Sequence, residues 1–275
     1  MPYHEGELEM QRRAGAADLA QRVGRIIGTD IPAAAAAFLA AQRFVIASTV
    51  DRQGWTRASL LGGEAGFAQA TSPRTVEITP ARGHVRDVRS DIGETGVIGL
   101  LAIDFASRRR IRVNGQATLR EGAIDVTTSE VYSNCPQYIT PRIVHAAAAD
   151  DAALSENMTD ALTISQQRWI ERADTFFLAT AHPQRGPDAS HRGGTGGFVR
   201  VVSPTVLAWP DYPGNNMFNS LGNLLVSAKA GLLFADFDTG ETLQLRGSAM
   251  VHGDETRVVQ FDIREVREIA LPVAR

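Results

Sequence analysis

Two adjacent basic residues are the most chemically suggestive pair in this 275-residue sequence. His191 and Arg192 follow Ser190 and precede Gly193 in a stretch that is typical of a strand. Successive strand residues point to opposite faces of a sheet, so one of the two side chains should face a ligand or an interface. The alternative is that both are solvated surface residues.

A second polar cluster lies further along the chain. Pro213 and Gly214 predict a turn, and Asn215 or Asn216 suits the cap of a helix that begins near Met217. Free backbone N–H groups at a helix start favour a phosphate. The cluster therefore predicts a phosphate site, the alternative being a capped helix without a ligand. Its side chains with hydrogen-bonding groups are Asn215, Asn216, Asn219 and Ser220.

Other patterns argue against several kinds of site. The histidines show no ligand spacing such as His-x-x-x-His, so we expect no metal site. The single cysteine, Cys135, excludes an intrachain disulfide, and it has no obvious partner for nucleophilic catalysis. The sequence has no Gly-x-Gly-x-x-Gly after a strand, no P-loop and no Gly-x-Ser-x-Gly. A nicotinamide would therefore be a visiting substrate and not the resident of a Rossmann domain.

The elements that must position these residues occur twice. Ser59–Phe67 matches Ser190–Phe198 in its serine, its paired glycines and its final phenylalanine, at an offset of 131 residues. Several matches in one register indicate a duplicated domain. The further matches have an offset of 132 and are Phe44–Ala47 with Phe176–Ala179, Gly99–Phe105 with Gly231–Phe237, and Gly115 with Gly247.

Each copy predicts the same series of elements. A short helix leads into an apolar strand, a hairpin turn, a second strand through the glycine pair and a third strand. A loop with a helix and two more strands complete the copy. This series favours a small β-barrel over a parallel doubly wound sheet. The expected helices are 33–42 and 164–173, and the expected strands include 44–50, 75–79, 97–105 and 109–119, then 175–181, 205–209, 230–237 and 242–251.

The predicted fold class is thus mainly β with α, with three parts. A polar, partly helical extension covers residues 1–32, the first barrel covers 33–150 and the second covers 160–275. The copies differ where the chemistry is expected. Leu60 and Leu61 stand where the second copy has His191 and Arg192, so the first copy is expected to be an apolar partner wall. Its segment 81–89 is basic, which suits either a phosphate or a solvated helix.

Composition narrows the setting. The 28 basic and 31 acidic residues give a formal net charge of −3, which offers no electrostatic reason to expect a nucleic-acid partner. No segment approaches the roughly 20 apolar residues that a membrane span needs. The alanine-rich run at 33–41 follows a polar stretch, which argues against a secretory signal. A cytoplasmic location is expected.

Long motifs at 187–194, 211–224 and 231–234 point to a known family. They resemble the pyridoxamine 5′-phosphate oxidase-like FMN-binding split-barrel superfamily. Together with Tyr3–Gly15 and Asn134–Ile139, they are similar to its long tandem members, which also occur fused to ferredoxin-reductase modules. The resemblance covers nearly the whole chain.

The resemblance implies six-stranded split barrels with FMN held non-covalently between two of them. It places the flavin-lining strand at 190–193 and the phosphate-binding turn and helix at 215–220. Gln137 and Tyr138 are further candidates for hydrogen bonds at a flavin edge. The expected cofactor contacts are therefore Ser190, His191, Arg192, Gly193, Asn215, Asn216, Asn219, Ser220, Gln137 and Tyr138.

These observations predict an FMN-dependent oxidoreductase that passes electrons between NAD(P)H or reduced flavin and oxygen or a small acceptor. A reductase partner and a homodimer are also expected. The vitamin-forming oxidases of the family carry a C-terminal Trp and an Arg-x-His/Asn-x-Arg cluster, which the segment 261–272 lacks. Pyridoxamine phosphate is therefore not the expected substrate. The alternatives are a non-catalytic flavin or haem binding protein of the same fold, or a structural barrel without a site.

Overall fold

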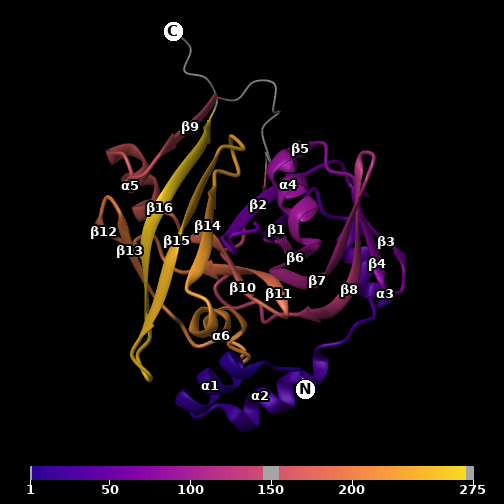
Figure 1. Ribbon diagram of the computed structural model, residues 1–275, viewed down its shortest axis with the longest axis horizontal. Coiled ribbons are helices and arrows are strands. Elements are labelled where there is room, and N and C mark those ends of the chain that lie inside the picture. The colour runs from indigo at the N-terminus through magenta and orange to yellow at the C-terminus, as the bar shows by residue number, and fades with distance from the viewer. Residues whose placement is uncertain (1, 145–154, 271–275) are drawn as a thin grey trace.

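Two curved antiparallel sheets lie side by side in the computed structural model, which describes residues 2–144 and 155–270 (Figure 1). The first sheet comes from the N-terminal half of the chain and the second from the C-terminal half. The predicted fold class, two tandem split barrels behind a helical extension, is confirmed. The last residues of the two predicted barrels, 145–150 and 271–275, lie outside the described residues.

Both units are built mainly of strands. The first unit contains β1 (Phe44–Val50), β2 (Thr56–Gly62), β3 (Ala68–Ser72), β4 (Thr75–Ile78), β5 (Arg82–Gly83), β6 (Val97–Asp104), β7 (Arg109–Arg120) and β8 (Ala123–Ser133). The connection to the second unit contains β9 (Ser155–Thr159). The second unit contains β10 (Thr175–His182), β11 (Gly186–Gly193), β12 (Arg200–Ser203), β13 (Val206–Pro210), β14 (Lys229–Ala235), β15 (Thr242–His252) and β16 (Val258–Ala270).

The two sheets repeat one strand order. The first runs β3-β4-β8-β7-β6-β1-β2, with β5 added at its edge. The second runs β12-β13-β16-β15-β14-β10-β11, with β9 paired to β16. Every strand of the first series has its counterpart at the same place in the second. The duplication inferred from the sequence is therefore a duplication of the whole sheet.

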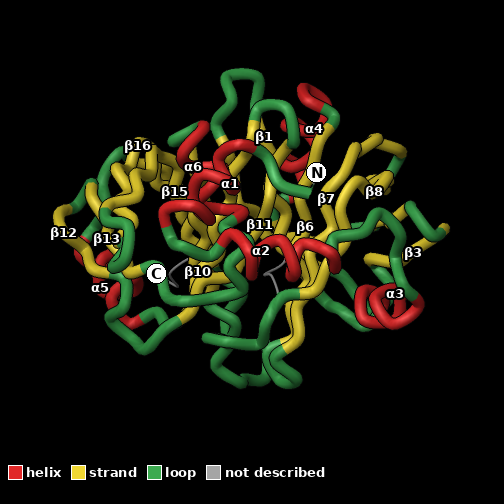
Figure 2. Tube along the Cα trace, turned by 90° about the horizontal axis from the view of Figure 1, so that it is seen from below, coloured by secondary structure: helices red, strands yellow, loops and turns green. Residues whose placement is uncertain are grey.

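The helices follow the same repeat. Helices α3 (Ala33–Ala40) and α5 (Ile164–Arg172) precede the first strand of each unit, as the sequence predicts. Helices α4 (Val85–Thr95) and α6 (Asn219–Val226) occupy the connection before β6 and β14. The predicted N-terminal extension forms α1 (Glu5–Arg13), α2 (Ala17–Val23) and the short 3-10 helix η1 (Gly24–Ile26). Figure 2, which views the molecule from below, shows α1 and α2 in front of the strands.

The sequence interpretation misses several strands. It ends each copy at β7 or β15, whereas β8 and β16 follow and pair with them along their length. It also misses the short strands β3 and β12. The repeating series thus has seven strands per unit where the family resemblance implies six. Strand β8 alternates buried and exposed residues and is rich in Thr, Ser and acidic groups, so its apolar signal is weak.

A buried apolar layer joins the two units. Phe44 and Ile46 from β1 pack in one cluster with Phe177 and Ala179 from β10. The residues that alternate with them, such as Val45 and Phe176, belong to the separate cores of the two units. Because β1 and β10 are buried on both faces, they read as continuous apolar runs in the sequence.

Two equivalent glycines allow this close contact. A Cβ on Gly99 would lie 2.4 Å from the carbonyl oxygen of Pro187, and one on Gly231 would lie 2.8 Å from that of Thr56. Gly99 in β6 therefore sits against β11 of the other unit, and Gly231 in β14 sits against β2. The repeated Gly-Leu-Leu motif thus marks the places where the backbones of the two units meet.

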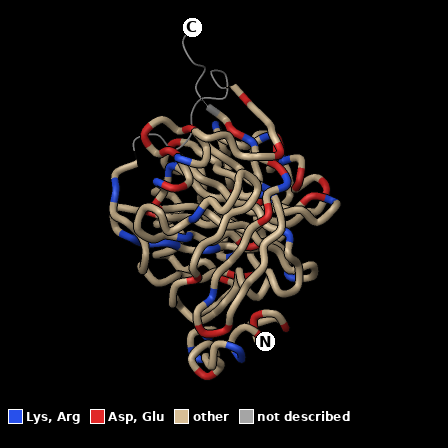
Figure 3. Tube along the Cα trace, turned by 90° about the vertical axis from the view of Figure 1, so that its left-hand side faces the viewer, with Lys and Arg blue, Asp and Glu red and all other residues tan. Residues whose placement is uncertain are grey.

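The charged residues form no separate layer in this architecture. Figure 3 shows acidic and basic residues interspersed along the chain in that view. None of the helices in the described part of the chain is long and apolar enough to cross a membrane.

Candidate functional site

A cleft opens where the two units meet near the start of α6. Strand β11 and the segment before α6 form one side, and β7 with the segment after β8 forms the other. The cavity has a volume of about 110 Å³. Its lining includes nine of the ten residues predicted to contact a cofactor, namely His191, Arg192, Gly193, Asn215, Asn216, Asn219, Ser220, Gln137 and Tyr138.

The tenth residue, Ser190, lies directly behind this lining. Its side chain is fully buried, and its Oγ lies 2.9 Å from the Oγ of Ser220 at the start of α6. Ser190 also donates to the carbonyl oxygen of Leu178 on the neighbouring strand. It therefore connects β11 to α6 and holds the position of Ser220.

His191 faces the other unit, as the alternation along β11 requires. Its ring packs edge-on against Phe105 and Phe177, and only 6% of the residue is exposed. Arg110 Nη1 lies 3.0 Å from His191 Nδ1 and donates to it. Burial, followed by the charges of the neighbouring arginines, holds the pKa of His191 well below its usual range. The imidazole is therefore neutral and orients Arg110.

Arg192 points to the opposite side and forms an ion pair. Its Nη1 donates to Asp211 Oδ1 at 2.7 Å, and Arg257 donates to the other oxygen of the same carboxylate at 2.9 Å. Two guanidinium groups thus share one carboxylate. The predicted phosphate contact of Arg192 remains a prediction, and the structure shows that Asp211 already orients its side chain.

The first unit adds two arginines from β7. Arg110 donates to the carbonyl oxygen of Cys135 at 2.7 Å, and Arg112 pairs with Asp188 across the interface at 2.5 Å. Burial and the nearby charges of Arg112 and Arg192 lower the pKa of Arg110 to about 10, so it stays protonated at neutral pH. The sequence interpretation omits these two arginines.

Positive charge exceeds negative charge in this group. Four arginines stand against two aspartates, which leaves a surplus of two positive charges on Arg110, Arg112, Arg192, Arg257, Asp188 and Asp211. A phosphate monoester carries about −1.5 to −2 charges at neutral pH. The cleft is therefore matched to a dianion.

Unpaired polar atoms point to the same place. In the described part of the chain, ten buried side-chain nitrogen or oxygen atoms have no hydrogen-bond partner. Half of them belong to residues that line this cleft: the Nε atoms of Arg110, Arg112 and Arg192, and both amide atoms of Asn134. Buried polar groups normally have partners, so this concentration favours a bound ligand.

The backbone of the lining is also unusual. Four non-glycine residues in the described ranges have positive φ, and Tyr138, Asn216 and Phe218 among them line the cleft. Such conformations cost about 1–3 kcal/mol each and concentrate at functional sites. Tyr138 stacks on Tyr212 at a centroid distance of 5.2 Å, and its hydroxyl donates to the carbonyl oxygen of Pro213. The two tyrosines therefore form an aromatic edge at the mouth.

The predicted helix cap is wrong. Helix α6 begins at Asn219, after Phe218 in the left-handed conformation, and no side chain caps its first turn. Asn215 instead accepts a hydrogen bond from the backbone N–H of Met217 in a turn before the helix. Positive φ at Asn216 and Phe218 prevents the helix from starting earlier. The amide cluster lines the cleft mainly through this turn.

The equivalent place in the other half has a different lining. Leu60 and Leu61 are fully buried there, and His84 Nε2 lies 3.0 Å from Thr242 Oγ1. A cavity of about 680 Å³ at this place is lined by residues that include His84, Asp87 and Arg267. Thr242 is the counterpart of Arg110. Nearby, Arg267 bridges Asp87 and Glu156. Leu60 and Leu61 are apolar as expected, but Arg110 and Arg112 show that the first copy is not an apolar wall at the cleft.

Comparison with known proteins fits this architecture. Residues 162–271 match the family described as pyridoxamine 5′-phosphate oxidase. The matched residues are those of the second unit. The first unit repeats its strand order and packs against it as a second split barrel. No curated protein matched the chain.

Similar solved structures each cover about two fifths of this chain. A Lactobacillus delbrueckii protein provisionally described as a pyridoxamine 5′-phosphate oxidase is 20% identical, with 39% of this chain and 94% of that chain covered and a TM-score of 0.34. A Clostridium acetobutylicum protein related to general stress protein 26 is 12% identical, with coverages of 40% and 89% and a TM-score of 0.30. The haem storage protein HutZ from Vibrio cholerae is 10% identical, with coverages of 38% and 91% and a TM-score of 0.30.

Proposed function

We propose that the cleft binds FMN and that the chain is an FMN-dependent oxidoreductase. Electrons would pass between NAD(P)H or reduced flavin and oxygen or a small acceptor. The observation that carries the proposal is the set of unpaired, buried guanidinium N–H groups at a cleft with two surplus positive charges. The family match over the second unit supports the choice of a flavin.

The lining offers suitable contacts for each part of this cofactor. Arg110, Arg192 and Asn134 would hold the phosphate, because their unpaired N–H groups and charge suit an anion. Tyr138 and Tyr212, which are 41% and 36% exposed, offer aromatic surface to a planar ring. The cavity is smaller than the roughly 300–1,000 Å³ of typical cofactor pockets, so it would enclose only part of the cofactor.

FMN itself supplies the electron-transfer chemistry when it is bound. The chain would bind and orient it. Neutral His191 holds Arg110 through Nδ1, and Asp211 holds Arg192, so both guanidinium groups are positioned before a ligand arrives. Such preorganisation lowers the entropy cost of binding. Because His191 Nδ1 accepts from Arg110, the proton of the neutral ring lies on Nε2, so neither ring nitrogen offers a free lone pair to haem iron.

The visible spectrum of the purified protein tests this proposal. We expect flavin bands that NADH, NADPH or dithionite bleaches and air restores. Bleaching only after a separate reductase is added would assign the donor to a partner protein. A Soret band would replace FMN with haem, and a colourless protein that does not bind added FMN would refute both ligands.

We also propose one FMN per chain, since the equivalent place in the other half has Leu60, Leu61 and Thr242 where the cleft has His191, Arg192 and Arg110. Titration of apo-protein with FMN, followed by flavin fluorescence, gives the stoichiometry. Light scattering during gel filtration would test the expected homodimer. Two FMN per chain would contradict the assignment of the first unit as a partner wall.

A further inference from the structure

The N-terminal extension is joined closely to the helix that lines the cleft. Helix α1 crosses α6 where Gly6 meets Gly222, and a Cβ on Gly6 would lie 2.2 Å from the carbonyl oxygen of Gly222. Figure 1 shows α1 directly below α6. Further along α1, Gln11 Nε2 donates to the carbonyl oxygen of Met217 in the turn before α6. The extension therefore contacts the ligand-binding segment from behind.

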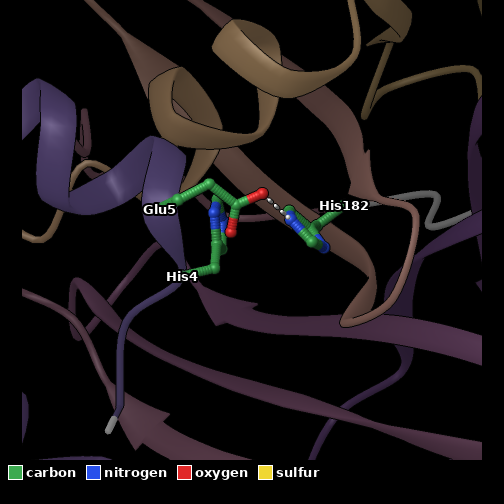
Figure 4. Close-up of side chains that lie close together, drawn as sticks. All are labelled: His4, Glu5 and His182. Atoms are coloured by element: carbon green, nitrogen blue, oxygen red, sulfur yellow. Dashed lines mark hydrogen bonds and ion pairs between the residues drawn. The ribbon is translucent and has the colours of Figure 1, made fainter.

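A cluster of His4, Glu5 and His182 fixes the start of this helix (Figure 4). His182 Nε2 lies 3.0 Å from Glu5 Oε1. His4 Nε2 lies 2.9 Å from Asn223 Oδ1 on α6. The Nδ1 atoms accept backbone N–H groups, from Gly6 for His4 and from Gln184 for His182.

These hydrogen bonds decide what the cluster does. Because each Nδ1 accepts from a backbone N–H, each proton must reside on Nε2, and both Nε2 atoms donate to oxygen. Histidines that ligate a metal donate their second N–H to an acceptor, and here that atom faces a donor. The cluster is therefore a hydrogen-bonded anchor that attaches α1 to β10 and α6.

Glu7 connects the anchored helix to the cleft. Its carboxylate accepts from the backbone N–H of His4 at 2.8 Å and from Asn219 Nδ2 at 2.6 Å. Only 5% of Glu7 is exposed. Because a carboxylate only accepts hydrogen bonds, it determines which end of the Asn219 amide it binds. The nitrogen of that amide faces Glu7, which leaves the oxygen for a partner in the cleft.

We propose that Glu7 is a positioning residue that makes Asn219 a hydrogen-bond acceptor toward the ligand. This inference rests on the proposed binding of FMN. A phosphate dianion has no hydrogen to donate, whereas the ribityl hydroxyls and the ring N3–H of a flavin do. Asn219 therefore binds the sugar alcohol or ring part of the cofactor, and the arginines bind its phosphate.

Affinities for FMN and for riboflavin, which lacks the phosphate, test the inference. The titrations are made at pH 8.5, where Glu7, with a pKa raised by burial to about 7, is ionised. We expect Glu7→Ala to weaken the binding of both flavins by the same factor, about tenfold, which is the usual range for one hydrogen bond. Glu7→Gln should recover part of the loss, because its amide oxygen can still accept from Asn219.

Two further variants on the same helix separate positioning from folding. Gly6→Val should separate α1 from α6 and reduce affinity at least as much as Glu7→Ala. Glu9→Ala is the matched control, because Glu9 forms ion pairs with Arg12 and Arg13 of its own helix. Unchanged affinity in Glu7→Ala, an equal loss in Glu9→Ala, or a loss for FMN alone would overturn the inference. Failure of the wild-type chain to bind either flavin would refute the proposed function and this inference with it.

Discussion

Removing the Arg192 side chain tests the proposed phosphate site most directly. Arg192→Ala removes one of the two surplus positive charges and a half-buried guanidinium whose buried Nε is unpaired. Asp211 keeps its second partner, Arg257, at 2.9 Å, so no buried carboxylate is left alone. A hydrogen bond to a charged group contributes about 1.5–3 kcal/mol. The dissociation constant for FMN should therefore rise about 10- to 150-fold.

The assay is fluorescence titration of apo-protein with FMN and, in parallel, with riboflavin. Riboflavin should bind Arg192→Ala as tightly as it binds the wild type. Asp211→Asn is the matched opposite change, because it removes the negative charge of the same ion pair. It should tighten the binding of FMN at low salt. If Arg192→Ala loses affinity equally for FMN and riboflavin, or loses affinity for neither, the phosphate does not bind at Arg192.

Three more predictions concern stability. Gly99→Ala should lower the free energy of unfolding by about 1–3 kcal/mol, because its Cβ would lie 2.4 Å from Pro187 O. Urea denaturation measures this change. Gly28→Ala is the control, because a Cβ on Gly28 would have no described heavy atom within 4 Å. Asp188→Asn should cost about 3–5 kcal/mol in the same assay, since it leaves Arg112 buried without its carboxylate, and a cost below 1 kcal/mol would contradict that pairing. Burial raises the pKa of Glu7 from 4.5 to about 7, so folding favours the protonated carboxyl group. The stability that this group contributes is therefore fully present below pH 4.5 and is lost as the pH rises through 7. The free energy of unfolding should fall by about 3 kcal/mol over this range. Glu7→Gln should remove this pH dependence from the urea denaturation midpoints. Midpoints that vary with pH in the same way for the wild type and Glu7→Gln would refute the prediction.

The repeat in the sequence carries most of the predictable fold. Matches such as Ser59–Phe67 with Ser190–Phe198 locate β2 and β11 and the helices and strands around them. Strands β8 and β16 escape because one face of each is solvated, and a half-polar strand has no continuous apolar run. Their pairing partners, β7 and β15, become visible only once the sheet is assembled.

The site divides in the same way. Side chains from the second unit are predictable because His191 and the amide cluster differ from their counterparts in the first unit. Arg110 and Arg112 are missed because they lie in an ordinary strand of the unit expected to be apolar. A signal was present, since their counterparts in the repeat are the uncharged Thr242 and Gln244. The closeness of His4 and His182 could not be inferred, since 178 residues separate them and only the packing of α1 brings them together.

The shared strand order of the two units has a consequence for how such a site can change. Where two identical chains form a site, every substitution occurs twice, so a residue that improves one wall also alters the other. A tandem chain is free of that symmetry, and Leu60 and His191 can specialise separately. The covalent connection also fixes the effective concentration of one half toward the other. Affinity for the ligand should therefore be independent of protein dilution.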